Sequence, residues 1–318
     1  MGASQSGDAR QVADARRRND WVLIGVPTSA GAHHAGQDRA PAALRAAGII
    51  ERLQAAGVPI SDAGDLPGSV FTVDHDHPQA PNLAAVVSVA RAVADAVETQ
   101  VAAGRRPLVV GGDCTITLGV IAGFRRVHPD VGLAYVDGDA DLGAAEPGAP
   151  QSDASGILDA TGIAHLLGRG TPELNGLGGT PPLLPPERLA MVGCDPREIG
   201  AAGRRFLAEA NVSFADGPEL AADPEGAARR ALTVLGRAAG PFVVHFDVDV
   251  VDSGDLPLGN YPHYGSGTEL EQVVRCLRVL LSDPAAAALV LTEVNPSYDP
   301  DGGLLDRYVD GLVTVLAG

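Results

Sequence analysis

The stretch VGLAYVDGDADL, residues 131–142, combines two patterns that bear on the fold and on the position of a site. Residues 131–136 form an uninterrupted apolar run, which is typical of a parallel strand buried on both faces. Aspartates follow at positions 137, 139 and 141, where the run ends. The stretch therefore predicts a buried strand whose carboxyl end carries three acids.

Outward from this stretch, similar apolar runs alternate with segments of helical spacing. The runs are WVLIGVP, RPLVVGGD, VGLAYVD, LAMVGCD, PFVVHFDVDVVD and AAALVLTEVNP. The helical segments include residues 40–57, 82–104 and 268–281, the last opening with a T-x-x-E capping box from Thr268 to Glu271. Strands that alternate with helices favour a parallel sheet with helices on both faces. Since neither a linker nor a repeat interrupts the alternation, we expect one domain over residues 20–318 and a flexible tail over residues 1–19.

The composition argues against several classes of function. The net charge of −17 disfavours a nucleic-acid partner, because phosphate binding needs a basic face. No apolar run approaches the ~20 residues of a membrane span, and the polar start lacks the apolar region of a secretory signal. The three cysteines are far apart and show no paired spacing, which fits a reducing compartment. We therefore expect a cytoplasmic protein without nucleic-acid or membrane partners.

Acids follow four of the predicted strands at their carboxyl ends, where ligands of parallel sheets bind. They are Asp113; Asp137, Asp139 and Asp141; Asp247, Asp249 and Asp252; and Glu293. Residues two apart in an extended segment face the same way, so these carboxylates can share one space. Crowded carboxylates repel unless a cation lies among them, and hard divalent metals take carboxylate oxygens. The pattern favours a metal site; the alternative is that the acids cap helices and bind loops without an ion.

These acids stand in motifs that resemble those of the ureohydrolase family, which includes arginase and agmatinase. GGDCT at 111–115 resembles the family's GGDH segment, DGDAD at 137–141 its DAHxD segment, and HFDVDVVD at 245–252 its S-x-D-x-D-x-x-D segment. TEVNP at 292–296 resembles its closing strand, and the likeness covers residues 21–316. It implies a three-layer α/β/α fold with a parallel sheet of about eight strands. It also implies a homo-oligomer whose site holds two Mn²⁺ ions bridged by a hydroxide, and this hydroxide attacks the guanidinium carbon of a small cationic substrate and releases urea.

Carried over residue by residue, the resemblance implies retained metal ligands at Asp137, Asp141, Asp247 and Asp249. Glu293 falls where the family's glutamate binds the guanidinium. Ser155 falls in the segment that begins the family's serine-glycine helix and is expected to bind substrate.

The departures from the family pattern concern all three site histidines. Cys114 and Asp139 replace two metal-binding histidines, and Asp159 replaces the histidine that shuttles protons. Asp139 and a Cys114 thiolate add negative charge around the metal, and the soft sulfur prefers Zn²⁺ or Fe²⁺ to Mn²⁺. Alternatively, Cys114 is a buried, uncharged thiol, and one metal position is weak or empty. Ile157 replaces the polar residue that contacts a substrate carboxylate, which argues for a substrate larger or less polar than free arginine.

Three other histidines also bear on the predicted site. His33, in the loop after the first strand, is expected to contact substrate. His263 is a candidate replacement for the lost proton carrier. His245, two residues before Asp247 and on its face, is expected to be a core or supporting residue and not a ligand.

Three functional hypotheses follow from these residues. The first is a metal-dependent hydrolase of guanidino or amidine C–N bonds in a small or specialised metabolite. The second is the same scaffold with altered chemistry in a biosynthetic pathway. The third is a non-catalytic homologue with a degenerate metal site.

Overall fold

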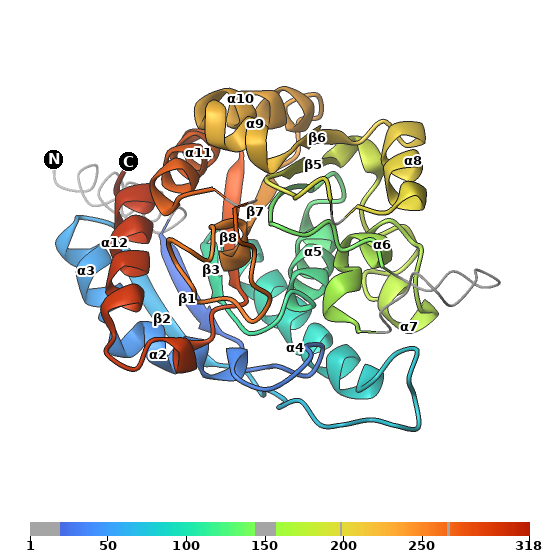
Figure 1. Ribbon diagram of the computed structural model, residues 1–318, viewed down its shortest axis with the longest axis horizontal. Helices are drawn as coiled ribbons and strands as arrows, with labels where there is room; N and C mark the ends of the chain where they lie inside the picture. Colours follow the sequence, from blue (N-terminus) through green and yellow to red (C-terminus); the bar gives the residue numbers. More distant parts are fainter. Residues whose placement is uncertain (1–19, 144–156, 198, 266–267) are drawn as a thin grey trace, which may run out of the picture.

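A single parallel sheet organises the computed structural model, which describes residues 20–143, 157–197, 199–265 and 268–318. Its eight strands lie in the order β2-β1-β3-β8-β7-β4-β5-β6, and every neighbouring pair is parallel (Figure 1). The strands are β1 (Trp21–Gly25), β2 (Ile60–Asp65), β3 (Arg106–Val110), β4 (Gly132–Val136), β5 (Leu189–Val192), β6 (Ser213–Ala215), β7 (Phe242–Asp247) and β8 (Ala286–Thr292). The α/β fold with a parallel sheet of about eight strands is thereby confirmed.

Helices cover both faces of the sheet and make a three-layer molecule (Figure 1). One face packs on α2 (Ala40–Ala46), α3 (Ile49–Ala55), α9 (Gly217–Ala222), α10 (Pro224–Leu235), α11 (Leu270–Ser282) and α12 (Gly303–Ala317). The other face packs on α4 (Leu83–Ala102), α5 (Ile116–Val127), α6 (Gly162–Leu166), α7 (Pro172–Asn175) and α8 (Ala201–Glu209). Short 3₁₀ helices are η1 (Gln37–Arg39), η2 (Asp159–Thr161), η3 (Pro186–Arg188), η4 (Val248–Val250) and η5 (Pro296–Tyr298).

Alternation along each strand divides the core into two apolar clusters, one under each helical layer. In β7, Val244 and Phe246 belong to the cluster with α10–α12, whereas Val243 belongs to the cluster with α4–α8. His245 and Asp247 have the same parity as Val243 and therefore share its side of the sheet. Since all strands are parallel, their carboxyl ends meet at one edge of the sheet, and the acids of the sequence motifs lie there.

Close backbone packing at this edge explains one glycine of the GGD motif. A Cβ on Gly112 would lie 1.7 Å from the carbonyl oxygen of Thr28. No side chain fits at that distance, so only glycine allows the turn after β3 to approach the loop after β1.

Two predictions of local structure are wrong. The segment 40–57 forms two helices, because Gly48 adopts φ 76° between α2 and α3 and ends the regular helix. The capping box of α11 begins at Glu269 and not at Thr268: the Glu269 N–H donates to Gln272 Oε1 at 3.0 Å. Thr268 instead forms an isolated bridge with Val251.

Within the described residues, no helix is long and apolar enough to cross a membrane. The predicted tail, residues 1–19, and Ser155 lie outside the described residues.

Candidate metal and substrate site

Four side chains from three strand ends form the inner group: Cys114, Asp137, His245 and Asp247. The Cys114 Sγ lies 2.6 Å from Asp247 Oδ2, 3.7 Å from His245 Nε2 and 3.9 Å from Asp137 Oδ2. His245 Nε2 lies 3.4 Å from Asp137 Oδ2. All four residues are buried, and their donor atoms lie within 4.8 Å of one another. The inner group thus offers one sulfur, one nitrogen and two oxygens to a single point.

His245 is held in a fixed orientation beneath this point. Its Nδ1 lies 2.8 Å from the Thr117 hydroxyl on α5, and its ring stacks on Tyr135 at 4.1 Å with 13° between the planes. Nε2 is therefore directed toward the inner group. Burial lowers the pKa of His245 to about 3, so the imidazole is neutral and has a lone pair for a metal.

A second set, the outer group, consists of Asp139, Asp249 and His263. His263 Nε2 lies 3.8 Å from Asp139 Oδ2 and 3.8 Å from Asp249 Oδ2. The two groups are linked through the backbone, because the Gly138 N–H next to Asp137 donates to Asp249 Oδ1 at 3.1 Å. The outer group supplies one nitrogen and two oxygens.

Glu293 lies beside the inner group, together with Asp159 and Gln37. The Cys114 backbone N–H donates both to Asp159 Oδ1 at 2.8 Å and to Glu293 Oε1 at 3.1 Å. Gln37 Nε2 donates to Glu293 Oε2 at 2.8 Å. Gln37 is 1% exposed, and its Oε1 has no hydrogen-bond partner among the described residues. Two carboxylates and an unused amide oxygen therefore lie together.

Burial dominates the electrostatics of this edge of the sheet. It raises the pKa of Asp137, Asp159, Asp249 and Glu293 well above their ordinary values, and the repulsion among these carboxylates adds to the effect. Burial and the nearby Asp247 also raise the pKa of the Cys114 thiol well above its usual range. A cation among these groups would reverse this preference, since it favours their ionised forms.

The donor chemistry fits a divalent transition metal. Carboxylate oxygen, neutral imidazole nitrogen and thiolate sulfur are the protein ligands of such ions. Each group gathers at least three of these donors within 4.8 Å.

The remaining predicted residues lie in three different situations. Asp141 belongs to neither group: its Oδ2 accepts a hydrogen bond of 2.5 Å from the Tyr135 hydroxyl, and its backbone has φ 47°. His33 is exposed; partial burial and the neighbouring His34 lower its pKa, and the Asp139 carboxylate opposes them, so the loop after β1 runs close to the outer group. Ile157 is half-buried at the start of the segment that leads to η2.

The sequence predicted His245 as a core or supporting residue, and the structure places its Nε2 within the inner group; Gln37 was not predicted. The period of two along β7 put His245 on the face of Asp247, and this was the available signal. Gln37 had no comparable signal, because it follows a loop and reaches Glu293 from 256 positions away in the sequence.

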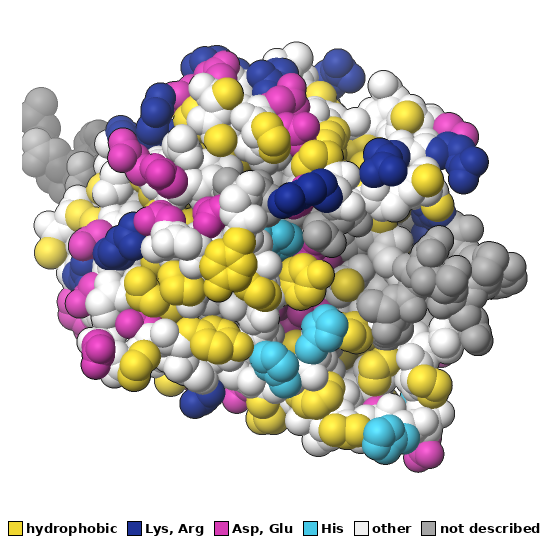
Figure 2. All heavy atoms as spheres, in the orientation of Figure 1, with side chains coloured by type: hydrophobic (Ala, Val, Ile, Leu, Met, Phe, Trp, Pro, Cys, Tyr) yellow, Lys and Arg dark blue, Asp and Glu magenta, His cyan; other side chains and the backbone are white. Residues whose placement is uncertain are grey.

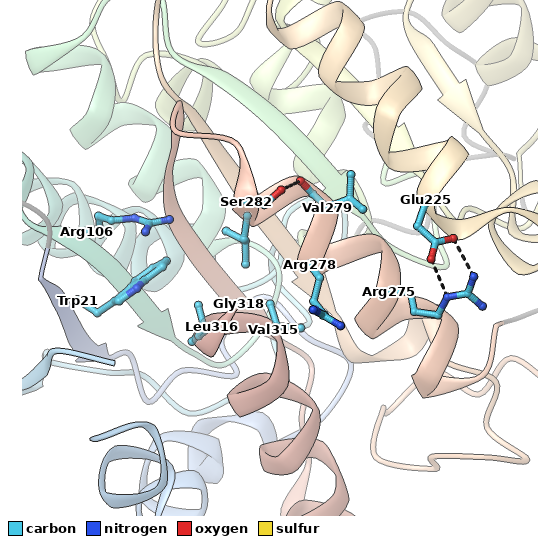
Figure 3. Close-up of a pocket in the computed structure, with 11 residues that line it drawn as sticks. Trp21, Arg106, Glu225, Arg275, Arg278, Val279, Ser282, Val315, Leu316 and Gly318 are labelled. Atoms are coloured by element: carbon cyan, nitrogen blue, oxygen red, sulfur yellow. Dashed lines mark hydrogen bonds and ion pairs between the residues drawn. The ribbon is translucent and has the colours of Figure 1, made fainter. Parts of the chain in front are cut away.

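A separate pocket lies at the opposite edge of the sheet and belongs to a different part of the molecule. Trp21 and Arg106, the first residues of β1 and β3, line it together with residues of α11 and α12 (Figure 3). Its carboxylate, Glu225, is bound to Arg275 at 2.8 and 2.9 Å (Figure 3). This pocket therefore lacks a metal-donor group of the kind found at the carboxyl edge.

Comparison with known proteins agrees with this geometry. A profile of the Arginase family matches residues 19–311. The chain is 30% identical over 284 residues to the arginase of Bacillus caldovelox, which covers 87% of this chain and 91% of that protein. It is 27% identical over 301 residues to arginase-1 of Homo sapiens, with 92% and 90% covered.

Solved structures show the same fold. The arginase of Bacillus caldovelox superposes with a TM-score of 0.82 at 25% identity and covers 93% of this chain and 98% of that chain. The proclavaminate amidino hydrolase of Streptomyces clavuligerus, at 21% identity, has a TM-score of 0.70 with 94% and 92% covered.

An eight-stranded parallel sheet with metal donors and a glutamate at its carboxyl edge is the arrangement of the ureohydrolase class. The chain belongs to the arginase family, whose members are hydrolases of C–N bonds.

Proposed function

We propose that the protein is a metal-dependent hydrolase that cleaves a guanidino or amidine C–N bond of a small cationic metabolite. The observation that supports this most is the position of Glu293, next to a four-donor metal group at the carboxyl edge of the sheet. A cationic carbon centre bound to Glu293 would lie beside the inner and outer groups.

A divalent ion held by the inner and outer groups would activate water as a nucleophile at neutral pH. Mn²⁺ is expected from family membership; Fe²⁺ and Zn²⁺ are compatible with the donors. The seven side chains of the two groups would hold and orient the metal, and six of them are buried; Asp139 is half-buried.

Glu293 and Gln37 form the part of the site that would recognise the substrate. The Glu293 carboxylate and the unused Gln37 Oε1 both accept hydrogen bonds, and a guanidinium or amidinium group presents several N–H donors in one plane. The Gln37 N–H would orient Glu293 for this contact.

The surroundings of the site favour a substrate with an apolar part. Tyr261, Tyr264 and Tyr298 are 47%, 67% and 45% exposed on loops that follow β7 and β8. Figure 2 shows histidine and acidic side chains together near the middle of this face, with apolar side chains around them. Exposed aromatic rings of this kind accept cationic and apolar groups.

Asp159 is the residue that we assign to proton transfer. Burial, together with the nearby Asp113 and Asp247 carboxylates, raises its pKa well above the ordinary carboxyl range, which favours a carboxyl group that can take up a proton and deliver it to the leaving amine. His263 contacts both acids of the outer group, so we assign it to metal binding in preference to proton transfer. His33 and Ser155 remain predicted substrate contacts.

The proposal also includes a cytoplasmic homo-oligomer. Family membership supports the homo-oligomer. The three cysteines, which are all unpaired in the structure, fit a reducing cytoplasm. Size-exclusion chromatography with light scattering measures the subunit number directly.

Hydrolysis of a compound panel tests the proposed function. The metal-free protein is loaded separately with Mn²⁺, Fe²⁺ and Zn²⁺ and incubated with guanidino, amidino and formimino compounds, and urea, ammonia and formamide are measured. We expect turnover of at least one compound, lost in Asp247→Asn and retained in Asp301→Asn, an exposed acid after η5. Absence of every product from loaded protein would refute the hydrolase and favour the non-catalytic hypothesis.

A further inference from the structure

The inner group contains a histidine that the family motif does not have. His245 stands at the serine of the S-x-D-x-D-x-x-D pattern, and Cys114 stands at the histidine of the GGDH pattern. The two changes meet in space, because Cys114 Sγ and His245 Nε2 are 3.7 Å apart. The nitrogen donor absent at position 114 is thus supplied from β7.

We propose that the inner group is a four-coordinate zinc-class site, in which Cys114 provides a thiolate and His245 a neutral nitrogen. This inference rests on the proposed function and deepens it, because it names the metal preference of the inner group. Four protein ligands leave no position for water on that ion, so water activation falls to an ion in the three-donor outer group. The inference can be tested without catalysis.

The spacing of the donors supports four-coordinate geometry. With Zn–S of about 2.3 Å and Zn–N or Zn–O of about 2.0 Å, a tetrahedral site separates sulfur from its neighbours by about 3.5 Å and nitrogen from oxygen by about 3.3 Å. The corresponding separations here are 3.7 Å from Cys114 Sγ to His245 Nε2, 3.9 Å from Sγ to Asp137 Oδ2 and 3.4 Å from Nε2 to Asp137 Oδ2. The 2.6 Å between Sγ and Asp247 Oδ2 is about 0.9 Å shorter than the tetrahedral separation, so metal binding requires these two atoms to move apart.

The second atom of each ligand is already committed elsewhere. Asp137 Oδ1 accepts from the Asp139 N–H at 2.6 Å, and Asp247 Oδ1 accepts from the Asp249 N–H at 2.9 Å. The Nδ1 of His245 contacts the Thr117 hydroxyl on α5 at 2.8 Å. Each residue therefore presents one atom to the centre, and Asp247 Oδ2 also accepts a hydrogen bond from the Thr292 hydroxyl at 3.0 Å.

The two groups should differ in metal preference. Sulfur is a soft ligand that favours Zn²⁺ and Co²⁺ over Mn²⁺, whereas the outer group has carboxylates and one imidazole. We expect one tightly bound zinc per chain in the inner group and weaker binding in the outer group.

Cobalt spectroscopy on the metal-free full-length protein tests this directly. Co²⁺ in the inner group should give a near-ultraviolet thiolate-to-cobalt band and intense visible absorption typical of four-coordinate cobalt, and added Zn²⁺ should abolish both. The Cys114→Ala variant should lose the thiolate band. The His245→Gln variant should bind Zn²⁺ at least about tenfold more weakly, since even indirect supports of a metal ligand are worth that factor.

Matched controls come from the same chain. Cys276 is buried in the core on α11, and His165 is buried on α6, both outside the donor groups. Cys276→Ala and His165→Gln should leave the band and the zinc affinity unchanged. If Cys114→Ala does not fold, X-ray absorption at the zinc edge of the unmutated protein still decides, because it should detect one sulfur neighbour at about 2.3 Å.

The outcomes separate this inference from the proposed function. A sulfur neighbour on zinc together with no hydrolysis would uphold the inference and refute the hydrolase. Zinc without a sulfur neighbour, or an unchanged zinc affinity in His245→Gln, would overturn the inference, and hydrolysis in the same preparation would leave the proposed function standing.

Discussion

Two buried tyrosines allow a paired test of the structure around the site. Tyr135, 1% exposed on β4, donates its hydroxyl hydrogen to Asp141 Oδ2 at 2.5 Å. Tyr308, 0% exposed on α12, has a hydroxyl without a hydrogen-bond partner among the described residues. Replacement of either tyrosine by phenylalanine keeps the ring and removes the hydroxyl. The two variants therefore differ in whether a hydrogen bond is lost.

The two variants should move stability in opposite directions. Tyr135→Phe leaves the buried Asp141 carboxyl without its donor, which costs about 1–3 kcal/mol. Tyr308→Phe removes a buried, unsatisfied hydroxyl, which should be neutral or stabilise the fold by about 1 kcal/mol. The stack of ring 135 on His245 and of ring 308 on Phe246 should persist in both.

Urea denaturation followed by circular dichroism measures both free energies of unfolding in metal-free protein. The midpoint should fall in Tyr135→Phe and stay or rise in Tyr308→Phe, with an unchanged dependence on urea concentration. Equal losses in the two variants would refute the hydrogen-bond assignment, as would a neutral Tyr135→Phe.

Three other expectations concern the same edge of the sheet. Gly112→Ala should prevent folding, because its Cβ would lie 1.7 Å from a carbonyl oxygen, whereas Gly303→Ala, with open space around it, should fold normally by circular dichroism. Gln37→Leu should raise KM more than it lowers kcat in any active assay, by about 10–100-fold for loss of a hydrogen bond of about 1.5–3 kcal/mol to the charged Glu293. In metal-free protein the unfolding free energy should fall as pH rises above about 4. The buried carboxyls have raised pKa values, so the folded state binds more protons than the unfolded state. Urea titrations that show stability increasing with pH would contradict this.

The sequence predicted the central strands of the sheet better than its two outermost strands. The six apolar runs correspond to β1, β3, β4, β5, β7 and β8, which are buried throughout or nearly so. The two remaining strands, β2 and β6, are the edge strands of the sheet. All but one residue of β2 are exposed, and β6 has three residues, so neither produces a continuous apolar run. An edge strand lacks one neighbour and therefore lacks the burial on which the pattern depends.

For the site, the spacing of residues along a strand predicted which side chains lie at the carboxyl edge, whereas contacts between distant segments could not be predicted. The alternating acids predicted one shared space, but the structure divides them: Asp137 lies with Asp247, Asp139 lies with Asp249, and Asp141 is in neither group. His245 was within reach of the same local pattern, because it lies two residues before Asp247 on β7, whereas His263 reaches the outer group from a loop and no local pattern indicated it.

The left-handed backbone at Asp141 and Glu293, with φ of 47° and 63°, has an evolutionary consequence. A non-glycine residue in this region costs about 1–2 kcal/mol, which glycine at the same position would recover. Mutational drift under selection for stability alone should therefore enrich glycine at both positions. Glycine at either position would, however, remove a carboxyl group from the carboxyl edge of the sheet.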